Sequence, residues 1–218
     1  TTGFAVPTIF NNLPAGDYMF QVTDEFGCTY QESYTVDPVT NITVAASAFS
    51  DVTCFNLANG TATFDIANFA GTYNYVFDGA PIVNGVNTAQ LTFTALAPGL
   101  HTLVVTDFIT DCSNTASVTI SQPSASLDFT ATATNINCNN DNATITVVAT
   151  GGTPTYKYAV LQSPSSAPTL TAYGLSNLLT VDTNGGANML WDVYVVDANG
   201  CPINKPQTIV LDANPSNI

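Results

Sequence analysis

The stretches VTDEFGC (22–28), VTDFITDC (105–112) and VVDANGC (195–201) are three versions of one phrase. In each, apolar residues alternate with others up to an Asp, and a cysteine follows within five residues. Alternation of this kind predicts a strand with one buried face. The Asp opens a turn by accepting backbone N–H bonds, and a glycine, where present, supplies the positive φ. The phrase therefore predicts the end of a long strand, a tight turn, and a second strand after the cysteine.

The five cysteines form two classes that recur with the same period. The class-two cysteines end the phrase and lie 84 and 89 residues apart, at Cys28, Cys112 and Cys201. The class-one cysteines, Cys54 and Cys138, are also 84 residues apart. Self-similarity at a fixed period is the sequence signature of tandem repeats.

The segments around the cysteines give the boundaries of these repeats. GTATFDI (60–66) and NATITVV (142–148) match each other as strands after the class-one cysteines. We therefore predict two complete repeats, repeat 2 (residues 38–123) and repeat 3 (124–218). Residues 1–37, repeat 1, match only the C-terminal half, so we expect a truncated repeat there.

Each complete repeat contains about seven short alternating segments separated by turn residues. Strong helix formers are scarce, and no segment keeps a helical period, so we expect no helices. The fold class predicted is all-β, with tandem immunoglobulin-like antiparallel β-sandwich repeats. A barrel with a similar number of strands is the alternative.

Because the two classes recur as pairs, we predict the disulfides Cys54–Cys112 and Cys138–Cys201. Cys28 should be unpaired, or paired to a segment upstream of Thr1. Buried free thiols are the alternative, since a free cysteine behaves as a small apolar residue. A zinc site is disfavoured, because no CxxC occurs. Disulfides indicate an oxidising, extracellular compartment.

The charge balance excludes several kinds of partner. The chain has 16 acidic residues, no arginine and only two lysines, for a net charge of −14. Such a surface repels phosphates, so we expect neither nucleic acid binding nor membrane insertion. No apolar run is long enough to cross a bilayer.

Catalytic and metal-binding residues are not marked in this sequence. The single histidine, His101, alternates with apolar residues and is expected in the core or at its boundary. A serine triad needs such a base beside a nucleophile, and no motif supplies one. We expect no enzyme activity, no catalytic residue, no cofactor and no metal ligand set. Calcium stays an alternative at the turn acids, although capping of the turn is the favoured role; these acids are Asp24, Glu25, Asp107, Asp111 and Asp197.

Two variable segments, 78–90 and 162–174, are the places where we expect a binding surface if one exists, because loops on a rigid scaffold carry recognition. Their candidate partner is surface polysaccharide. The tyrosine pairs YNY (73–75) and YKY (156–158) would suit a sugar as well, but their strand position favours the core.

The segments INCNNDNATITV (136–147), GGTPTYKYAV (151–160) and VYVVDANGC (193–201) together resemble the SprB repeat of large surface adhesins from gliding bacteria. This resemblance implies export by type IX secretion, display on the surface of a Gram-negative cell, and a role in adhesion and gliding motility. It implies no ligand residues.

We therefore expect a non-enzymatic, extracellular stalk segment of an adhesin, whose partners are further repeats of the same chain. A polysaccharide-binding module using 78–90 and 162–174 is the alternative. Pairing of exposed strand edges of repeat 1 with another chain is a third option.

Overall fold

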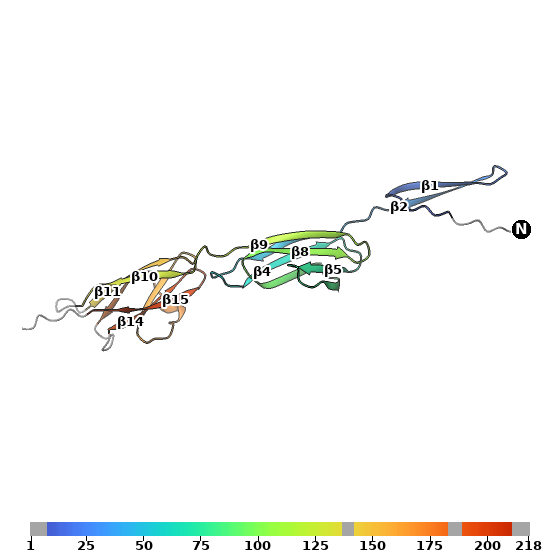
Figure 1. Ribbon diagram of the computed structural model, residues 1–218. Helices are drawn as coiled ribbons and strands as arrows, with labels where there is room; N and C mark the ends of the chain where they lie inside the picture. The colour runs from blue at the N-terminus through green and yellow to red at the C-terminus, as the bar shows by residue number, and fades with distance from the viewer. Residues whose placement is uncertain (1–7, 137–141, 183–188, 211–218) are drawn as a thin grey trace, which may run out of the picture. The chain divides into compact units, whose positions relative to one another are not determined.

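The computed structural model describes residues 8–136, 142–182 and 189–210 (Figure 1). In these ranges the chain forms antiparallel strands and a single 3-10 turn, η1 (Leu170–Ala172). The all-β fold class of immunoglobulin-like sandwiches is confirmed.

Repeat 1 contributes a hairpin of β1 (Gly16–Thr23) and β2 (Thr29–Val36), paired in register from Gly16↔Val36 to Thr23↔Thr29. One face of this hairpin is aromatic: Phe20 lies 5.7 Å from Tyr34, ring centroid to ring centroid. The predicted alternation holds, but its apolar face is not buried, because no second sheet covers it within the described residues.

Repeat 2 forms two sheets with the strand orders β3-β4-β7 and β6-β5-β8-β9 (Figure 1). The strands are β3 (Thr43–Ser50), β4 (Gly60–Ala67), β5 (Tyr73–Phe77), β6 (Val83–Val86), β7 (Gln90–Leu96), β8 (Gly99–Asp107) and β9 (Ser113–Ile120). Alternate residues of β4 and β8 are buried, as the period-two pattern predicts. Non-sequential neighbours in each sheet are typical of an immunoglobulin-like sandwich.

Repeat 3 forms two further sheets, with the orders β10-β11-β13 and β12-β14-β15. The strands are β10 (Asp128–Ala133), β11 (Asn142–Thr150), β12 (Lys157–Gln162), β13 (Leu178–Asp182), β14 (Leu190–Val196) and β15 (Pro202–Thr208). Among the described residues of repeat 3, no strand corresponds to the short strand β6 of repeat 2. Tyr158 instead makes an isolated bridge to Gly174.

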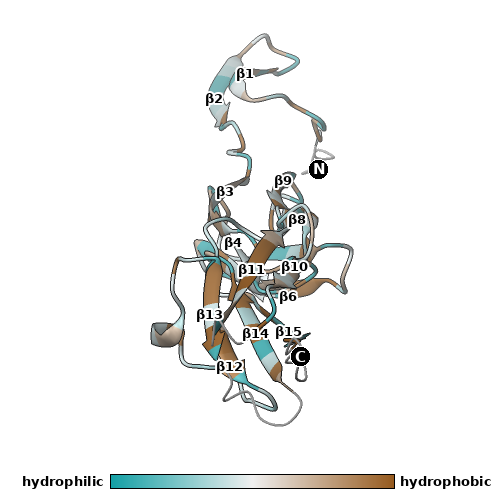
Figure 2. Ribbon diagram, turned by 90° about the vertical axis from the view of Figure 1, so that its left-hand side faces the viewer, coloured by the Kyte–Doolittle hydropathy of each residue, from teal (hydrophilic) through white to brown (hydrophobic). Residues whose placement is uncertain are grey.

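The core of repeat 3 is built from both of its sheets. Ala143, Ile145 and Val147 of β11 are fully buried, and they cluster with Val193 and Val195 of β14. The hydropathy colouring of Figure 2 shows the apolar character of β11. At about 25 cal/mol per Å² of apolar surface, each of the valine and isoleucine side chains contributes roughly 1.5–3 kcal/mol on burial.

The chain folds into two compact units whose boundaries differ from those of the repeats. One unit comprises Thr1–Ala45, Asp65–Gln90 and Thr102–Ala116, and the other comprises Ala46–Phe64, Leu91–His101 and Ser117–Ile218. Among the strands that the structure describes, no sheet crosses the boundaries predicted at 37/38 and 123/124. The domain boundaries nevertheless stay a prediction.

Replacing a core residue of β11 tests the burial pattern. We expect Ile145→Ala to lower the free energy of unfolding of repeat 3 by about 2–5 kcal/mol, since it removes buried methyl groups and leaves a cavity. Val148→Ala is the matched control, because Val148 lies on the same strand with its side chain exposed. Urea unfolding followed by the fluorescence of Trp191, the only tryptophan, measures both. Equal effects of the two substitutions would contradict the assigned faces of β11.

Candidate functional site

The turn after β14 is organised by one carboxylate. Asp197 Oδ1 accepts the backbone N–H groups of Asn199 at 3.0 Å and Cys201 at 2.9 Å. Its other oxygen, Oδ2, accepts the N–H of Thr153 at 2.8 Å, from the loop between β11 and β12. Asp197 is only 4% exposed, and these charge-assisted bonds compensate its burial. The carboxylate therefore fixes the turn, and with it the position of Cys201.

The same turn occurs in all three repeats. The N–H of the Asp donates to the carbonyl of the class-two cysteine in each case, at 3.0 Å for Asp24–Cys28, 2.9 Å for Asp107–Cys112 and 3.2 Å for Asp197–Cys201. The repeated phrase of the sequence thus corresponds to one repeated backbone structure. The predicted capping of the turn is confirmed for Asp24, Asp107 and Asp197, because Oδ1 of each accepts two backbone N–H groups of its own turn. For Glu25 and Asp111 capping stays a prediction.

A facing loop completes the turn of repeat 2. Asp107 Oδ2 accepts the N–H of Ala70, just as Asp197 accepts that of Thr153. Hydrogen bonds from the N–H of Thr110, and next from that of Ala70, hold the pKa of Asp107 below its ordinary value of 3.8. Because the folded-state pKa is the lower one, the contribution of Asp107 to stability is present above pH 3.8 and is lost as the pH falls below it.

The class-one cysteine lies in a second ordered loop, residues 51–59. Asn59 closes this loop by accepting the N–H of Thr53 at 3.1 Å and donating to its hydroxyl at 2.8 Å. Asp51 Oδ1 accepts the N–H of Ser121 at 2.7 Å, and Gln122 Oε1 accepts the N–H of Asn56 at 2.9 Å. The loop is therefore fastened to the segment that directly follows β9.

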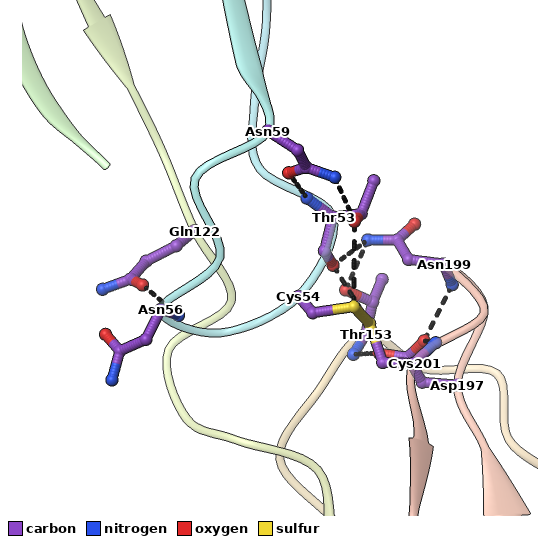
Figure 3. Close-up of a disulfide and its surroundings, with 9 residues drawn as sticks. All are labelled: Thr53, Cys54, Asn56, Asn59, Gln122, Thr153, Asp197, Asn199 and Cys201. Atoms are coloured by element: carbon purple, nitrogen blue, oxygen red, sulfur yellow. Dashed lines mark hydrogen bonds between the residues drawn. A yellow bond between two sulfur atoms is a disulfide. The ribbon is translucent and has the colours of Figure 1, made fainter. Parts of the chain in front are cut away.

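Loop 51–59 and turn 197–201 meet in a disulfide between Cys54 and Cys201, with Cα atoms 5.8 Å apart (Figure 3). Asn199 Nδ2 reinforces the contact by donating to the carbonyl of Thr53 and to the hydroxyl of Thr153, both at 3.0 Å. We call this set the cysteine junction: Thr53, Cys54, Thr153, Asp197, Asn199 and Cys201. All six residues belong to the second compact unit.

The predicted pairs Cys54–Cys112 and Cys138–Cys201 are therefore wrong: Cys54 of repeat 2 is bonded to Cys201 of repeat 3. Strand length gives the physical reason. Cys112 directly precedes β9, whereas loop 51–59 is bound to residues that directly follow it. Eight strand residues rise about 26 Å, and a disulfide tolerates a Cα separation of only about 4.4–6.8 Å. Recurrence identified the two classes, but not which repeat supplies the partner.

The other cysteines differ in their surroundings. Cys28 is an exposed free thiol and Cys112 a half-buried one. The former agrees with an unpaired Cys28, and pairing to an upstream segment stays a prediction. Cys138 lies outside the described residues.

The predicted absence of a catalytic centre stays a prediction. The half-buried His101 has Nε2 2.8 Å from the carbonyl oxygen of Ala97, on the strand where a position in the core or at its boundary was expected. Tyr73 and Tyr158 are buried, as predicted for the core, whereas Tyr75 and Tyr156 of the same pairs are half-buried. Within residues 8–136, 142–182 and 189–210, no three His, Cys, Asp or Glu side chains are grouped to hold a metal ion. Calcium binding at the turn acids stays a prediction.

Both variable segments are fastened to the sandwich by hydrogen bonds. Segment 78–90 contains β6, and Asn74 Oδ1 accepts the N–H of Gly85 at 3.0 Å. Segment 162–174 is held by Asp192, whose Oδ2 accepts the N–H and hydroxyl of Ser165, both at 2.8 Å. A pocket of about 190 Å³ lies beside the disulfide, between Phe55 and Leu127. This volume is below the roughly 300–1,000 Å³ of small-molecule sites.

Three junction residues were not identified from the sequence: Thr53, Thr153 and Asn199. One signal was available for Asn199. It stands two residues after the turn Asp, where the other repeats have Phe26 and Ile109, so the third turn departs from the apolar pattern of the first two.

The turn carboxylate offers a direct test of the junction. We expect Asp197→Ala to lower the free energy of unfolding of repeat 3 by about 1–3 kcal/mol, because buried N–H groups lose their acceptor. Urea unfolding with Trp191 fluorescence measures the change. Asp24→Ala is the control, since the equivalent turn of repeat 1 is exposed and distant in sequence. An Asp197→Ala chain as stable as the Asp24→Ala chain would show that the carboxylate does not hold the turn.

Comparison with solved structures finds modular chains of low similarity. Three N-terminal domains of the outer capsid protein Hoc of bacteriophage RB49 are 16% identical with a TM-score of 0.41; the match covers 78% of this chain and 59% of that one. Domains A168–A170 of titin are 10% identical with a TM-score of 0.38, covering 90% and 75%. These similarities carry no functional argument. No curated protein matches the chain.

A family model gives the more specific result. Residues 130–164 match the SprB repeat, and this range runs from β10 into the segment after β12. It includes the GGTPTYKYAV stretch on which the sequence resemblance rests. The chain therefore carries an SprB repeat within its tandem immunoglobulin-like β-sandwiches, as the resemblance predicts.

Proposed function

We propose that this chain is a stalk segment of a large extracellular adhesin, displayed on the surface of a Gram-negative cell and serving adhesion and gliding motility. The SprB repeat and the disulfide favour an extracellular location of this chain. The family resemblance supports export by type IX secretion. In the described ranges, no helix is long and apolar enough to cross a membrane.

The disulfide across the cysteine junction is the observation that carries the stalk proposal. It joins residues 147 positions apart in the sequence. Tension applied at the two ends of the chain passes from Cys54 to Cys201 through the sulfur atoms, and the residues between them are bypassed. Even if the repeats unfolded, the residues between Cys54 and Cys201 could not add to the length of the stretched chain. A covalent bypass of this kind suits a segment that transmits force while holding another part of the molecule away from the cell.

The acidic surface suits the same role. With a net charge of −14, neighbouring arrays repel each other and stay soluble. The partners proposed are further repeats of the same chain, and surface polysaccharide remains the second candidate.

Pulling a single molecule by its two ends tests the stalk. We expect the oxidised chain to lack the extension of the bypassed residues, and the Cys54→Ser, Cys201→Ser double variant to gain about 500 Å of contour length, at roughly 3.3–3.6 Å per residue. Cys28→Ser is the control, since this thiol is free.

Two results would contradict this function. One is an oxidised chain that extends as far as the double variant. The other is polysaccharide binding by the purified chain that is lost when segments 78–90 and 162–174 are replaced by short turns, since this would identify a recognition module. The stalk is supported if the oxidised chain extends less than the double variant and the purified chain shows no such polysaccharide binding.

A further inference from the structure

We propose that the class-two cysteine of each repeat pairs with the class-one cysteine of the repeat before it, so that Cys112 is the site at which repeat 2 is covalently joined to a preceding repeat of the same kind. This inference rests on the proposed stalk function and names the partner of that stalk: the loop equivalent to residues 51–59 in the preceding repeat.

Cys112 occupies the same structural position as Cys201. Each follows a turn whose Asp donates its N–H to the cysteine carbonyl, at 2.9 Å in repeat 2 and 3.2 Å in repeat 3. Each Asp also accepts an N–H from the facing loop, of Ala70 in the first case and Thr153 in the second. The backbone N–H of Cys201 donates to Asp197 Oδ1, whereas that of Cys112 donates to Thr110 Oγ1. Cys201 is bonded to a class-one cysteine of the repeat before it, and Cys112 stands at the corresponding end of the turn in repeat 2.

In the part of the chain that the structure describes, no loop covers Cys112 as loop 51–59 covers Cys201. Cys112 is a free thiol, whereas Cys201 is 7% exposed in its disulfide. Beside Cys112 the turn exposes two large apolar side chains, Phe108 at 67% and Ile109 at 71%. Ile109 stands two residues after Asp107, the position at which Asn199 contacts the class-one loop in repeat 3. An apolar side chain at this position suits a covering loop, because docking would remove it from water.

A pairing within repeat 2 does not satisfy the geometry. Loop 51–59 is fastened to Ser121 and Gln122, at the far end of β9 from Cys112. Repeat 1, as present in residues 1–37, contains no class-one cysteine. The proposed partner therefore has to come from a repeat that supplies its own loop of this kind on the N-terminal side of repeat 2.

The bond forms by thiol–disulfide exchange. Two cysteine thiols react with a small-molecule disulfide such as oxidised glutathione: one S–S bond breaks, one S–S bond forms between the repeats, and two glutathione thiols are released carrying the two protons. The electrons of the two protein sulfurs thereby reduce the donor disulfide. A disulfide oxidoreductase would serve as the same class of oxidant in an extracytoplasmic compartment.

A chain with one repeat duplicated supplies the missing partner. Residues 1–123 are followed directly by residues 39–218, so that Pro123 replaces Pro38 before the second copy of Val39. The protein is oxidised with glutathione, free thiols are alkylated, and the chain is cleaved at Asp and aromatic residues for mass spectrometry. We expect two linked peptides, Cys54–Cys201 and Cys54–Cys112. The unduplicated chain should show only the first.

Two matched variants decide which copies are joined. Cys112→Ser in the second copy should abolish the Cys54–Cys112 peptide, and Cys112→Ser in the first copy should leave it in place. The reverse pattern would show pairing within one repeat and would overturn the proposal. Alkylated Cys112 in both copies, in a chain that forms Cys54–Cys201, would overturn it as well. The Cys54–Cys201 peptide reports, in the same molecule, that the last junction has folded.

This outcome is separable from that of the stalk proposal. If the two copies are linked but the variable segments bind polysaccharide, the inter-repeat disulfide is supported and the stalk function is refuted. Unlinked copies in a chain that still resists extension through Cys54–Cys201 would refute only the present inference.

Discussion

A disulfide needs its two Cα atoms within about 7 Å, and the length of a single strand is enough to prevent this. In repeat 2, β9 separates Cys112 from the segment that holds loop 51–59. The two cysteine classes of one repeat are therefore kept at opposite ends of a strand. Because of this constraint, Cys54 pairs with a cysteine of the next repeat, Cys201. The covalent bypass proposed for the stalk depends on this pairing.

The aspartate turn supplies the precision that this bond requires. Asp197 accepts N–H groups from its own turn and from the facing loop, so the backbone of Cys201 is held by hydrogen bonds as well as by its bond to Cys54. Asn199 then contributes the polar contacts to Thr53 and Thr153. A cysteine held by the backbone loses little further conformational freedom when it pairs, which is the usual benefit of preorganisation. Evenly spaced junctions of this kind would leave short unbridged segments, such as the 25 residues between Cys112 and Cys138, as the extensible part of an array.

Much of the fold could be predicted from the sequence, because period-two alternation marks buried faces directly. Leu103 and Val105, Ala143 and Ile145 are buried as expected, and the turns after Asp107 and Asp197 are where the phrase places them. Burial failed as a prediction for Val22 of β1, whose face lacks a covering sheet among the described residues. The disulfide partner could not be derived, because alternation says which side a residue faces and nothing about which end of a strand meets which neighbour. Asn199 was missed because a turn asparagine is ordinarily explained by its own backbone.

The most direct measurement of the central claim is a disulfide map of the unreduced 218-residue chain by mass spectrometry. Because the chain has only two lysines and no arginine, cleavage at Asp or at aromatic residues is needed in place of trypsin. The account predicts a single peptide pair joining Cys54 to Cys201, with Cys28 and Cys112 recovered in alkylated form. A Cys54–Cys112 pair would contradict it, because that bond would place both cysteine classes at the same end of one repeat.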